Sequence, residues 1–245
     1  MEHKAYLEMA DVESRHWWFV GRRYILQRLI KSLDVTDTAK ILELGSGTGG
    51  NLQMLAQFGK VTAVEMNDTA RKISEAKGLS AEILPGVLPD QLQLGDRKFD
   101  LVVLLDVLEH IEHDQKTLAT INNLLTPNGL AIITVPAYRI LFSEHDRELH
   151  HKRRYERDEL MQKIQKSGLT IKKLCFFNTI LLPVAFALRL LCKQTGSEVP
   201  PHWLNAVLKT IFCSEGSWLP WINPPFGLSI LAVVGRSSTK ADLKV

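Results

Sequence analysis

Cysteine is scarce in this chain, and its cysteines show no pairing pattern. The three of them, Cys175, Cys192 and Cys213, are odd in number and lie far apart along the 245 residues. The absence of a C-x-x-C pair excludes a disulfide framework and a cysteine-based zinc site. We expect reduced and mostly buried thiols, as in a cytoplasmic protein.

Long apolar runs and a strong charge of one sign are also missing. No apolar run reaches the roughly 18 to 20 residues that a membrane-spanning helix needs, and the N-terminus lacks the features of a secretory signal. The formal net charge of +3 is too small to indicate nucleic acid as a partner. We therefore expect a cytoplasmic protein that is soluble or bound peripherally at the inner face of a membrane.

The chain does have the composition of a globular protein, with 45% hydrophobic and 23% charged residues. At 245 residues it is long enough for one large α/β domain with additions at its ends. This composition is compatible with many chemistries, so the function has to be inferred from motifs.

A glycine-rich turn between a predicted strand and a predicted helix is the most informative motif. Residues 41–44 predict a short buried strand, residues 45–50 (G-S-G-T-G-G) a tight turn, and residues 51–55 the start of a helix. Glycine is needed where the backbone approaches a ligand closely or takes a positive φ, and a helix start offers unpaired N–H groups. An ordinary βα turn is the alternative. The four glycines, and the acid Glu65 at the end of the next predicted strand, favour a nucleotide-containing ligand.

The kind of nucleotide follows from the residues around the turn. Gly45, Gly47 and Gly50 also fit the G-x-G-x-x-G pattern, so a nicotinamide or flavin oxidoreductase is the natural rival. However, Glu43 stands two residues before the first glycine, where it would repel a pyrophosphate and suit a cationic ammonium or sulfonium. The segment D-V-L-E-H at 106–110 follows an apolar strand and has no role in hydride transfer.

Together, E-L-G-S-G-T-G at 43–49, Glu65 and D-V-L-E-H-I at 106–111 resemble the class I S-adenosylmethionine-dependent methyltransferases. The similarity is to the branch that acts on small molecules and lipids (methyltransferase type 11/12-like), and it covers residues 38–177. It implies a Rossmann-like three-layer α/β sandwich with a mostly parallel seven-stranded sheet, an antiparallel last strand, and S-adenosyl-L-methionine as cofactor. It also implies an N-terminal helical lid over the sulfonium.

The resemblance implies a set of cofactor contacts at strand ends and turns, with Glu65 on the ribose diol. Many relatives carry an acid after the glycine that corresponds to Gly86, where it meets the adenine amino group. This chain has Val87 there, so adenine recognition is expected to use backbone groups near residues 86–88 or another side chain. The expected cofactor-binding residues are Glu43, Gly45, Ser46, Gly47, Gly49, Asn51, Glu65, Met66, Gly86, Val87, Leu88, Asp106 and Val107.

The segment 136–155 follows the fifth predicted strand and holds most of the candidate catalytic and acceptor-binding residues. A loop of about twenty residues in a compact domain is usually a binding segment, although a solvated charged loop that caps the next helix is the alternative. Its S-x-H-D…H-x-R-R-Y arrangement resembles one in bacterial methyltransferases of this branch. The first catalytic candidate is His145 held by Asp146, and the second is His110, which could instead shape its loop. The acceptor-binding candidates are Trp17, Trp18, Tyr138, His150, Arg153, Arg154 and Tyr155, and no metal is expected.

The chain divides into four expected parts. These are an N-terminal helical lid at 1–37, the cofactor-binding core at 38–177, an apolar helical insertion at 178–225, and a closing strand with a tail at 226–245. The aromatic cluster at 16–19 belongs either to the lid over the acceptor or to simple helix packing. The apolar segment 179–192 suits contact with a membrane or lipid substrate, or else a buried core or homodimer surface.

The predicted activity is methyl transfer from S-adenosylmethionine to a small hydrophobic acceptor, with O-methylation favoured. An isoprenoid, a polyprenyl-linked intermediate or an acyl lipid is the expected class. The alternative from another class is a non-catalytic adapter that keeps the cofactor pocket but holds a partner, and an NAD-binding oxidoreductase is the weaker rival. The sequence leaves open the identity of the acceptor, the choice among O-, N- and C-methylation, and the identity of the base.

Overall fold

The structure, a computed structural model, describes residues 3–183 and 199–236. The helices within them are α1 (His3–Val12), α2 (Trp17–Lys31), α3 (Leu52–Leu55), α4 (Asp68–Ala76), α5 (Asp114–Leu124), α6 (Glu144–Glu148), α7 (Arg157–Lys166) and α9 (His202–Ser214). Three short 3-10 turns are η1 (Leu108–His110), η2 (Arg139–Leu141) and η3 (Glu215–Ser217). The strands are β1 (Ala39–Leu44), β2 (Gly59–Glu65), β3 (Ala81–Val87), β4 (Gln91–Leu92), β5 (Phe99–Leu105), β6 (Leu125–Pro136), β7 (Leu169–Phe177) and β8 (Ser229–Arg236).

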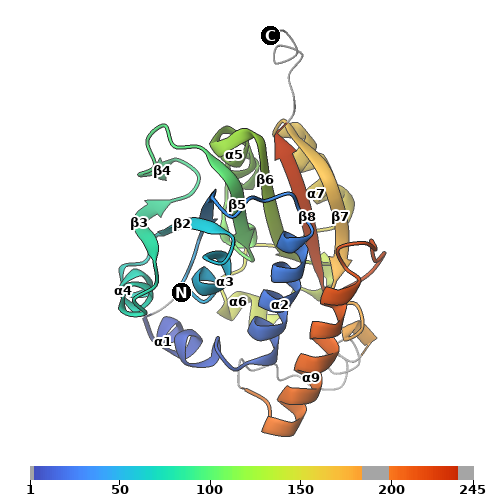
Figure 1. The fold of residues 1–245 in the computed structure, drawn as a ribbon. Coiled ribbons are helices and arrows are strands. Elements are labelled where there is room, and N and C mark those ends of the chain that lie inside the picture. Colours follow the sequence, from blue (N-terminus) through green and yellow to red (C-terminus); the bar gives the residue numbers. More distant parts are fainter. Residues whose placement is uncertain (1–2, 184–198, 237–245) are drawn as a thin grey trace.

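The strands form one sheet in the order β4-β3-β2-β1-β5-β6-β8-β7 (Figure 1). The pairs from β3 to β6 are parallel, and β8 is antiparallel to both β6 and β7. The predicted α/β fold with an antiparallel last strand is therefore confirmed, and the two-residue β4 adds a short eighth strand. Chain order reverses on either side of β1, and sheets of this kind bind their ligands outside the carboxyl ends of the strands at that point, here β1 and β5. This region is called the crevice.

The helices cover both faces of the sheet, as the nearly continuous apolar run of β5 requires. Val102 and Leu104 of β5 point into one core, which contains the apolar side chains of α5 and α7. Leu101, Val103 and Leu105 point into the other core, formed with α2, α3 and α9. Figure 1 shows the resulting three layers. The apolar strand expected directly before residue 106 is β5, and the expected end of the core at 177 is the end of β7.

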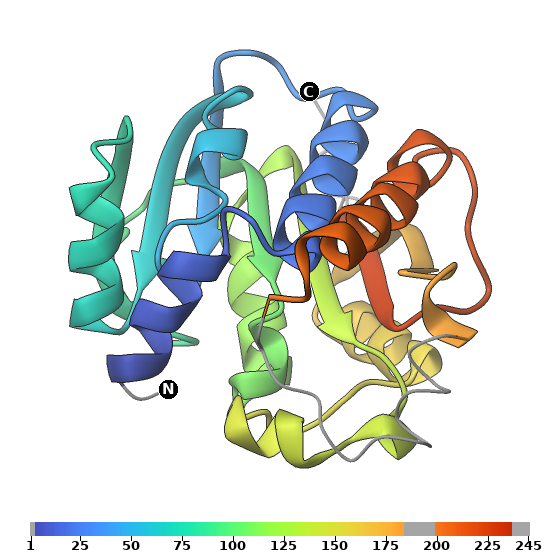
Figure 2. The ribbon, with the colours of Figure 1, turned by 90° about the horizontal axis from the view of Figure 1, so that it is seen from below.

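The N-terminal helices and the C-terminal insertion meet on one face of the sheet. Helices α2 and α9 lie side by side in both ribbon views (Figures 1 and 2), and they are in direct contact. Trp18 of α2 stacks on Phe212 of α9 with ring centroids 5.1 Å apart and planes 6° from parallel. The close approach depends on Gly21, where an added Cβ would lie 2.4 Å from the Phe212 ring. The aromatic cluster therefore serves helix packing.

The apolar insertion is described only in part. Within 3–183 and 199–236, no helix combines the length and the apolar character that crossing a membrane requires. Most of the expected apolar helix at 181–191 lies outside the described residues. The described part of the insertion is anchored by the buried Glu215, whose carboxylate accepts hydrogen bonds from the backbone N–H groups of residues 178, 179 and 180.

Candidate active site

The glycine turn after β1 has the positive-φ backbone that its sequence predicts. Gly45, Gly47 and Gly49 have φ values of +72°, +54° and +81°, which side chains with a Cβ rarely adopt. A Cβ added at Gly49 would also lie 2.2 Å from Ser74 Oγ. The helix behind the turn, α3, has only four residues. The dipole of so short a helix contributes little to ligand binding. The turn would therefore bind a ligand through its own backbone.

The carboxyl end of β5 lies against this turn, as expected for the two sides of one crevice. A Cβ on Gly45 would lie 2.7 Å from the Val107 side chain, so the turn and the segment after β5 are in contact. Asp106, the residue between β5 and Val107, has a φ of +55°, and its Oδ1 accepts a hydrogen bond from Thr134 Oγ1 at 3.0 Å. An aspartate in this uncommon conformation marks a locally constrained site.

Glu43 offers a buried carboxylate to the crevice. Its side chain is 1% exposed, and its Oε1 accepts a hydrogen bond from Asn51 Nδ2 at 2.7 Å. Its Oε2 is buried with no hydrogen-bond partner among the described residues. Burial raises the pKa of Glu43 to about 7, and the hydrogen bond from Asn51 opposes this only in part. A cationic ligand group would supply the missing partner.

Glu65 at the end of β2 is held by two backbone hydrogen bonds. Gly47 N donates to its Oε2 at 2.9 Å, and Asn67 N donates to its Oε1 at 2.8 Å. Each carboxylate oxygen keeps a further lone pair that could accept from a ribose hydroxyl. Beside it, Met66 and Val87 are 66% and 40% exposed at the ends of β2 and β3. These apolar side chains suit the face of a purine.

Helix α1 and the residue after it cover the glycine turn from outside. Thr48 Oγ1 donates to Glu13 Oε2 at 2.8 Å, and Lys77 forms an ion pair with the same carboxylate. A Cβ at Gly47 would lie 3.3 Å from the end of the Met9 side chain. Burial and the nearby charge of Glu65 raise the pKa of Tyr6 to about 12. These N-terminal residues were not predicted as site residues, because their contacts join distant parts of the chain.

Helix α2 contributes Arg22, another residue that the sequence did not single out. The side chain is nearly buried and forms an ion pair with Asp106 at the crevice. In the sequence, Arg22 looked like one of several polar residues beside an apolar stripe. Only the packing of α2 against the carboxyl end of β5 makes it part of the site.

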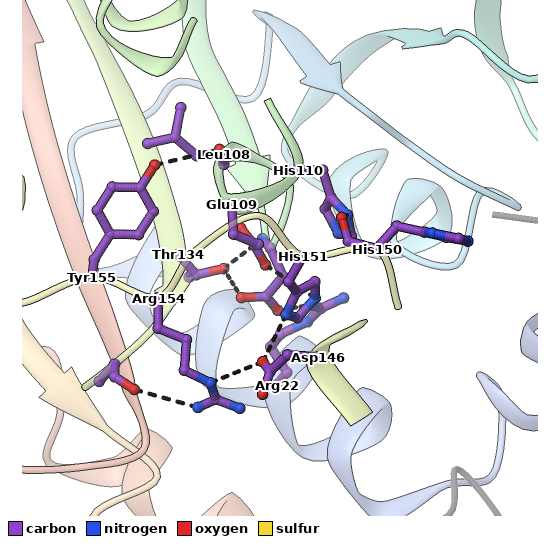
Figure 3. Close-up of polar contacts among 12 residues, drawn as sticks. Arg22, Leu108, Glu109, His110, Thr134, Asp146, His150, His151, Arg154 and Tyr155 are labelled. Atoms are coloured by element: carbon purple, nitrogen blue, oxygen red, sulfur yellow. Dashed lines mark hydrogen bonds and ion pairs between the residues drawn. The ribbon is translucent and has the colours of Figure 1, made fainter. Parts of the chain in front are cut away.

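The loop after β6 is organised around Asp146, and here the expected pairing is revised. The Asp146 carboxylate is fully buried and accepts hydrogen bonds from His151 Nδ1 at 2.9 Å and Arg154 Nε at 2.8 Å (Figure 3). Burial alone would raise the pKa of Asp146, but these hydrogen bonds outweigh burial and hold it well below its usual range. His145, the expected partner, has its Nδ1 3.7 Å from the Glu148 carboxylate. The histidine hydrogen-bonded to Asp146 is therefore His151 and not His145.

Next to this pair, the predicted candidate His110 lies against His151. Their ring centroids are 4.7 Å apart with planes at 81°, and His110 Nδ1 lies 3.3 Å from the carbonyl oxygen of His150. Burial and then the neighbouring His151 lower the pKa of His110 to about 4, so the ring is neutral at pH 7. The buried Glu109 completes this cluster (Figure 3). Glu109, His110 and His151 are potential metal ligands that the sequence did not predict as a set.

Three residues expected to bind the acceptor have hydrogen-bond or ion-pair partners within the chain. Tyr155 is 0% exposed, and its hydroxyl donates to Asp114 Oδ2 at 2.9 Å. Arg153 forms an ion pair with the same Asp114 carboxylate at 3.1 Å. Arg154 is nearly buried and bound to Asp146. Both arginines thus already have carboxylate partners within the chain, and their contact with an anionic acceptor stays a prediction.

Of the remaining acceptor-binding candidates, Trp17 and Trp18 pack between helices, and Tyr138 and His150 lie in the segment after β6. Trp17 meets the Phe212 ring edge to face at 5.6 Å, so like Trp18 it joins α2 to α9. Tyr138 has a φ of +61° and stacks on Phe176 at 5.4 Å. His150 has a φ of +59°, and its side chain extends away from Asp146 and Arg154 (Figure 3).

Comparison with known proteins places this site in a family. A family model described as a methyltransferase domain matches residues 16–198. The chain is 27% identical over 149 residues to the ubiquinone biosynthesis O-methyltransferase of Rickettsia felis, covering 54% of this chain and 60% of that protein. It is also 27% identical over 169 residues to a probable S-adenosylmethionine-dependent methyltransferase of Mycobacterium tuberculosis, covering 67% of this chain and 60% of that protein. The chain thus matches under two thirds of the length of these relatives.

A solved structure gives the same fold over a greater length. The putative methyltransferase of Haloferax volcanii, in complex with the Trm112 methyltransferase activator, is 17% identical with a TM-score of 0.64. The match covers 97% of this chain and 95% of that one. At this identity the match shows the fold alone.

The crevice fits the cofactor that this family uses. The unpartnered oxygen of Glu43 suits a cationic group, Glu65 suits a diol, and the positive-φ glycines allow a close backbone approach. The family model covers residues 16–198, which is most of the chain, so the chain belongs to the methyltransferase domain family.

Proposed function

We propose that the protein transfers a methyl group to a hydroxyl oxygen of a small hydrophobic molecule. The observation that carries this proposal is the Asp146–His151 pair, whose 2.9 Å hydrogen bond engages Nδ1 of the histidine and leaves Nε2 for the acceptor. A neutral hydroxyl needs a proton acceptor when it is methylated, whereas a carboxylate does not. The name of the Rickettsia relative, an O-methyltransferase, supports the same choice of oxygen.

The crevice residues have separate tasks in this proposal. Glu43 would hold the cationic end of S-adenosylmethionine, Glu65 the ribose diol, and the backbone of residues 86–88 the adenine. The bound cofactor supplies an electrophilic methyl carbon whose bond to sulfur breaks with the electron pair left on sulfur. The protein contributes alignment, which can be worth on the order of 7–11 kcal/mol. Helix α1, joined to the turn through Glu13, would exclude water from the crevice.

The hydrophobic character of the acceptor is supported by exposed apolar side chains at two places, on α9 and after η3. Trp203 and Val207, one turn apart on α9, are 68% and 47% exposed, and Trp221 and Ile222 after η3 are 78% and 55% exposed. Exposed tryptophans favour the headgroup level of a membrane. We infer that a lipid-like acceptor (an isoprenoid, a polyprenyl-linked intermediate or an acyl lipid) is reached at a membrane surface. A homodimer built on the same side chains is the alternative.

The proposal is tested with methyl-labelled S-adenosylmethionine and bacterial extracts split into lipid and aqueous fractions. We expect label in a lipid product that resists mild alkali, because a methyl ether survives conditions that cleave a methyl ester. His151→Gln should slow the reaction by about 10²–10⁴-fold without weakening cofactor binding.

The matched control is His113→Gln, an exposed histidine outside the crevice, which should keep the wild-type rate. Label confined to water-soluble or alkali-labile products would contradict methylation of a lipid hydroxyl. Absence of turnover with every acceptor class, together with tight capture of a partner, would favour the adapter.

A further inference from the structure

We infer that Glu109, His110 and His151 form a binding site for a divalent transition-metal ion. One potential ligand atom from each residue lies within 4.8 Å of the others. Two imidazole nitrogens with one carboxylate oxygen suit first-row ions such as Mn²⁺, Fe²⁺, Co²⁺ and Zn²⁺, whereas Mg²⁺ prefers oxygen ligands. The ligands come from η1 and from the loop before α7, which are brought together only in the folded protein.

Glu109 is the residue that distinguishes this cluster from a chance group of polar side chains. It is 0% exposed, and neither of its carboxylate oxygens has a hydrogen-bond partner among the described residues. Its Oε1 lies 3.9 Å from His151 Nε2, too far for a hydrogen bond. A buried carboxylate without a partner is costly. An ion between these atoms would remove that cost.

Both histidines are already oriented as metal ligands are. A ligating histidine characteristically donates its other ring N–H to a carboxylate or a backbone carbonyl. His151 has the Asp146 carboxylate at 2.9 Å from Nδ1, and His110 has the His150 carbonyl oxygen at 3.3 Å from Nδ1. In each ring, Nε2 is the nitrogen that remains for an ion (Figure 3).

The spacing of the cluster requires only a small adjustment to close on an ion. Ligand bonds of about 2.0–2.2 Å place two donors no more than about 4.4 Å apart. Burial and His151 keep the His110 pKa near 4, so this imidazole is in the neutral form that binds metals. Burial, then the charge of Asp106, raises the pKa of Glu109 well above its usual range.

Binding of the ion does not depend on the proposed function. The role of the ion in the reaction does, because it rests on the proposed methyl transfer to a hydroxyl. An ion in this position would hold the acceptor oxygen and lower the pKa of its hydroxyl. In the ion-loaded protein the proton would pass to water and His151 would serve as a ligand, whereas in the ion-free protein His151 Nε2 would take the proton itself. The freed oxygen electron pair forms the new bond to the methyl carbon as the carbon–sulfur bond breaks.

The test uses chelator-treated full-length protein titrated with CoCl₂, followed by calorimetry and visible absorption. We expect one Co²⁺ per chain and an absorption band typical of nitrogen ligation. Glu109→Gln and His151→Gln should each weaken binding at least tenfold, and Asp146→Asn should weaken it by about 10–100-fold through its hold on His151. His113→Gln is the matched control and should bind as the wild type does. Circular dichroism checks that each variant is folded.

Two results would overturn the site. One is the lack of saturable binding of Co²⁺, Mn²⁺ or Zn²⁺ by the wild type, and the other is an unchanged affinity in both the Glu109 and the His151 variants. The titration needs neither cofactor nor acceptor, so failure of methyl transfer does not bear on it. If the chelated protein methylates its acceptor at an unchanged rate, the ion has no part in the reaction, while the proposed function stands.

Discussion

At the scale of single residues, the buried carboxylate of Glu43 makes cofactor binding depend on pH. Its pKa is raised to about 7, so the group is mainly protonated at pH 6 and mainly ionised at pH 8. A cationic ligand favours the ionised form. Affinity for S-adenosylmethionine should therefore fall about tenfold per pH unit as the pH drops below 7, and should level off above it. Calorimetric titrations between pH 5.5 and 8.5 measure this.

The variant Glu43→Gln isolates the cause of the pH dependence. It is neutral at every pH, so its affinity should be weaker by about tenfold or more at pH 8, the worth of one charge-assisted contact, and flat with pH. Glu75→Gln, at an exposed site on α4, is the control and should follow the wild-type curve. A pH dependence that persists in Glu43→Gln would assign the titration to another group.

At the scale of elements, the contact between α2 and α9 joins the insertion to the core. Phe212 is 0% exposed between Trp17 and Trp18, and Gly21 leaves it the room it needs. Phe212→Ala should lower the free energy of unfolding by about 3–5 kcal/mol, because it leaves a cavity that the helices can close only in part. Urea denaturation measures this change.

Phe226→Ala is the matched control for this element. Phe226 has the same chemistry but is 49% exposed, so its loss should cost about 0.5 kcal/mol or less. Equal costs for the two variants would mean that α9 does not pack on α2 as described. A folded Phe212→Ala protein should still bind the cofactor, because Phe212 does not contact the glycine turn.

At the scale of the whole molecule, the exposed apolar side chains should bring the protein to membranes. Each tryptophan can bury on the order of 150–250 Å², which at about 25 cal/mol per Å² amounts to several kcal/mol as an upper limit. We expect the wild type to float with anionic liposomes, and Trp203→Gln with Trp221→Gln to lower the bound fraction at least tenfold. The apolar segment at 184–192 lies outside the described residues and is left unchanged.

Leu7→Gln provides the control for liposome flotation. Leu7 is an apolar residue on α1 with 49% exposure, close to that of Val207, so its replacement tests whether any loss of apolar surface has the same effect. We expect it to float like the wild type. If the wild type remains in solution as a dimer that the tryptophan changes split, the surface is an oligomer contact.

The sequence by itself determined the sheet and the location of the cofactor crevice. The apolar run at 101–105 lies in β5, because a strand buried on both faces needs apolar residues at nearly every position. The glycines at 45–49 predicted a turn with positive φ, and Glu43 and Glu65 were predicted as the two carboxylates beside this turn. These features are local, so neighbouring residues are enough to specify them.

Only the tertiary structure decided which side chains meet at the acceptor end of the crevice. Asp146 is hydrogen-bonded to His151, five residues further on, whereas the adjacent His145 was the expected partner. An irregular loop has no period from which such contacts can be inferred. Arg22 and Glu13 reach the crevice from helices that precede it by many residues. Glu109 and His151 meet because parallel strands place their carboxyl ends, and the loops that follow, at one edge of the sheet.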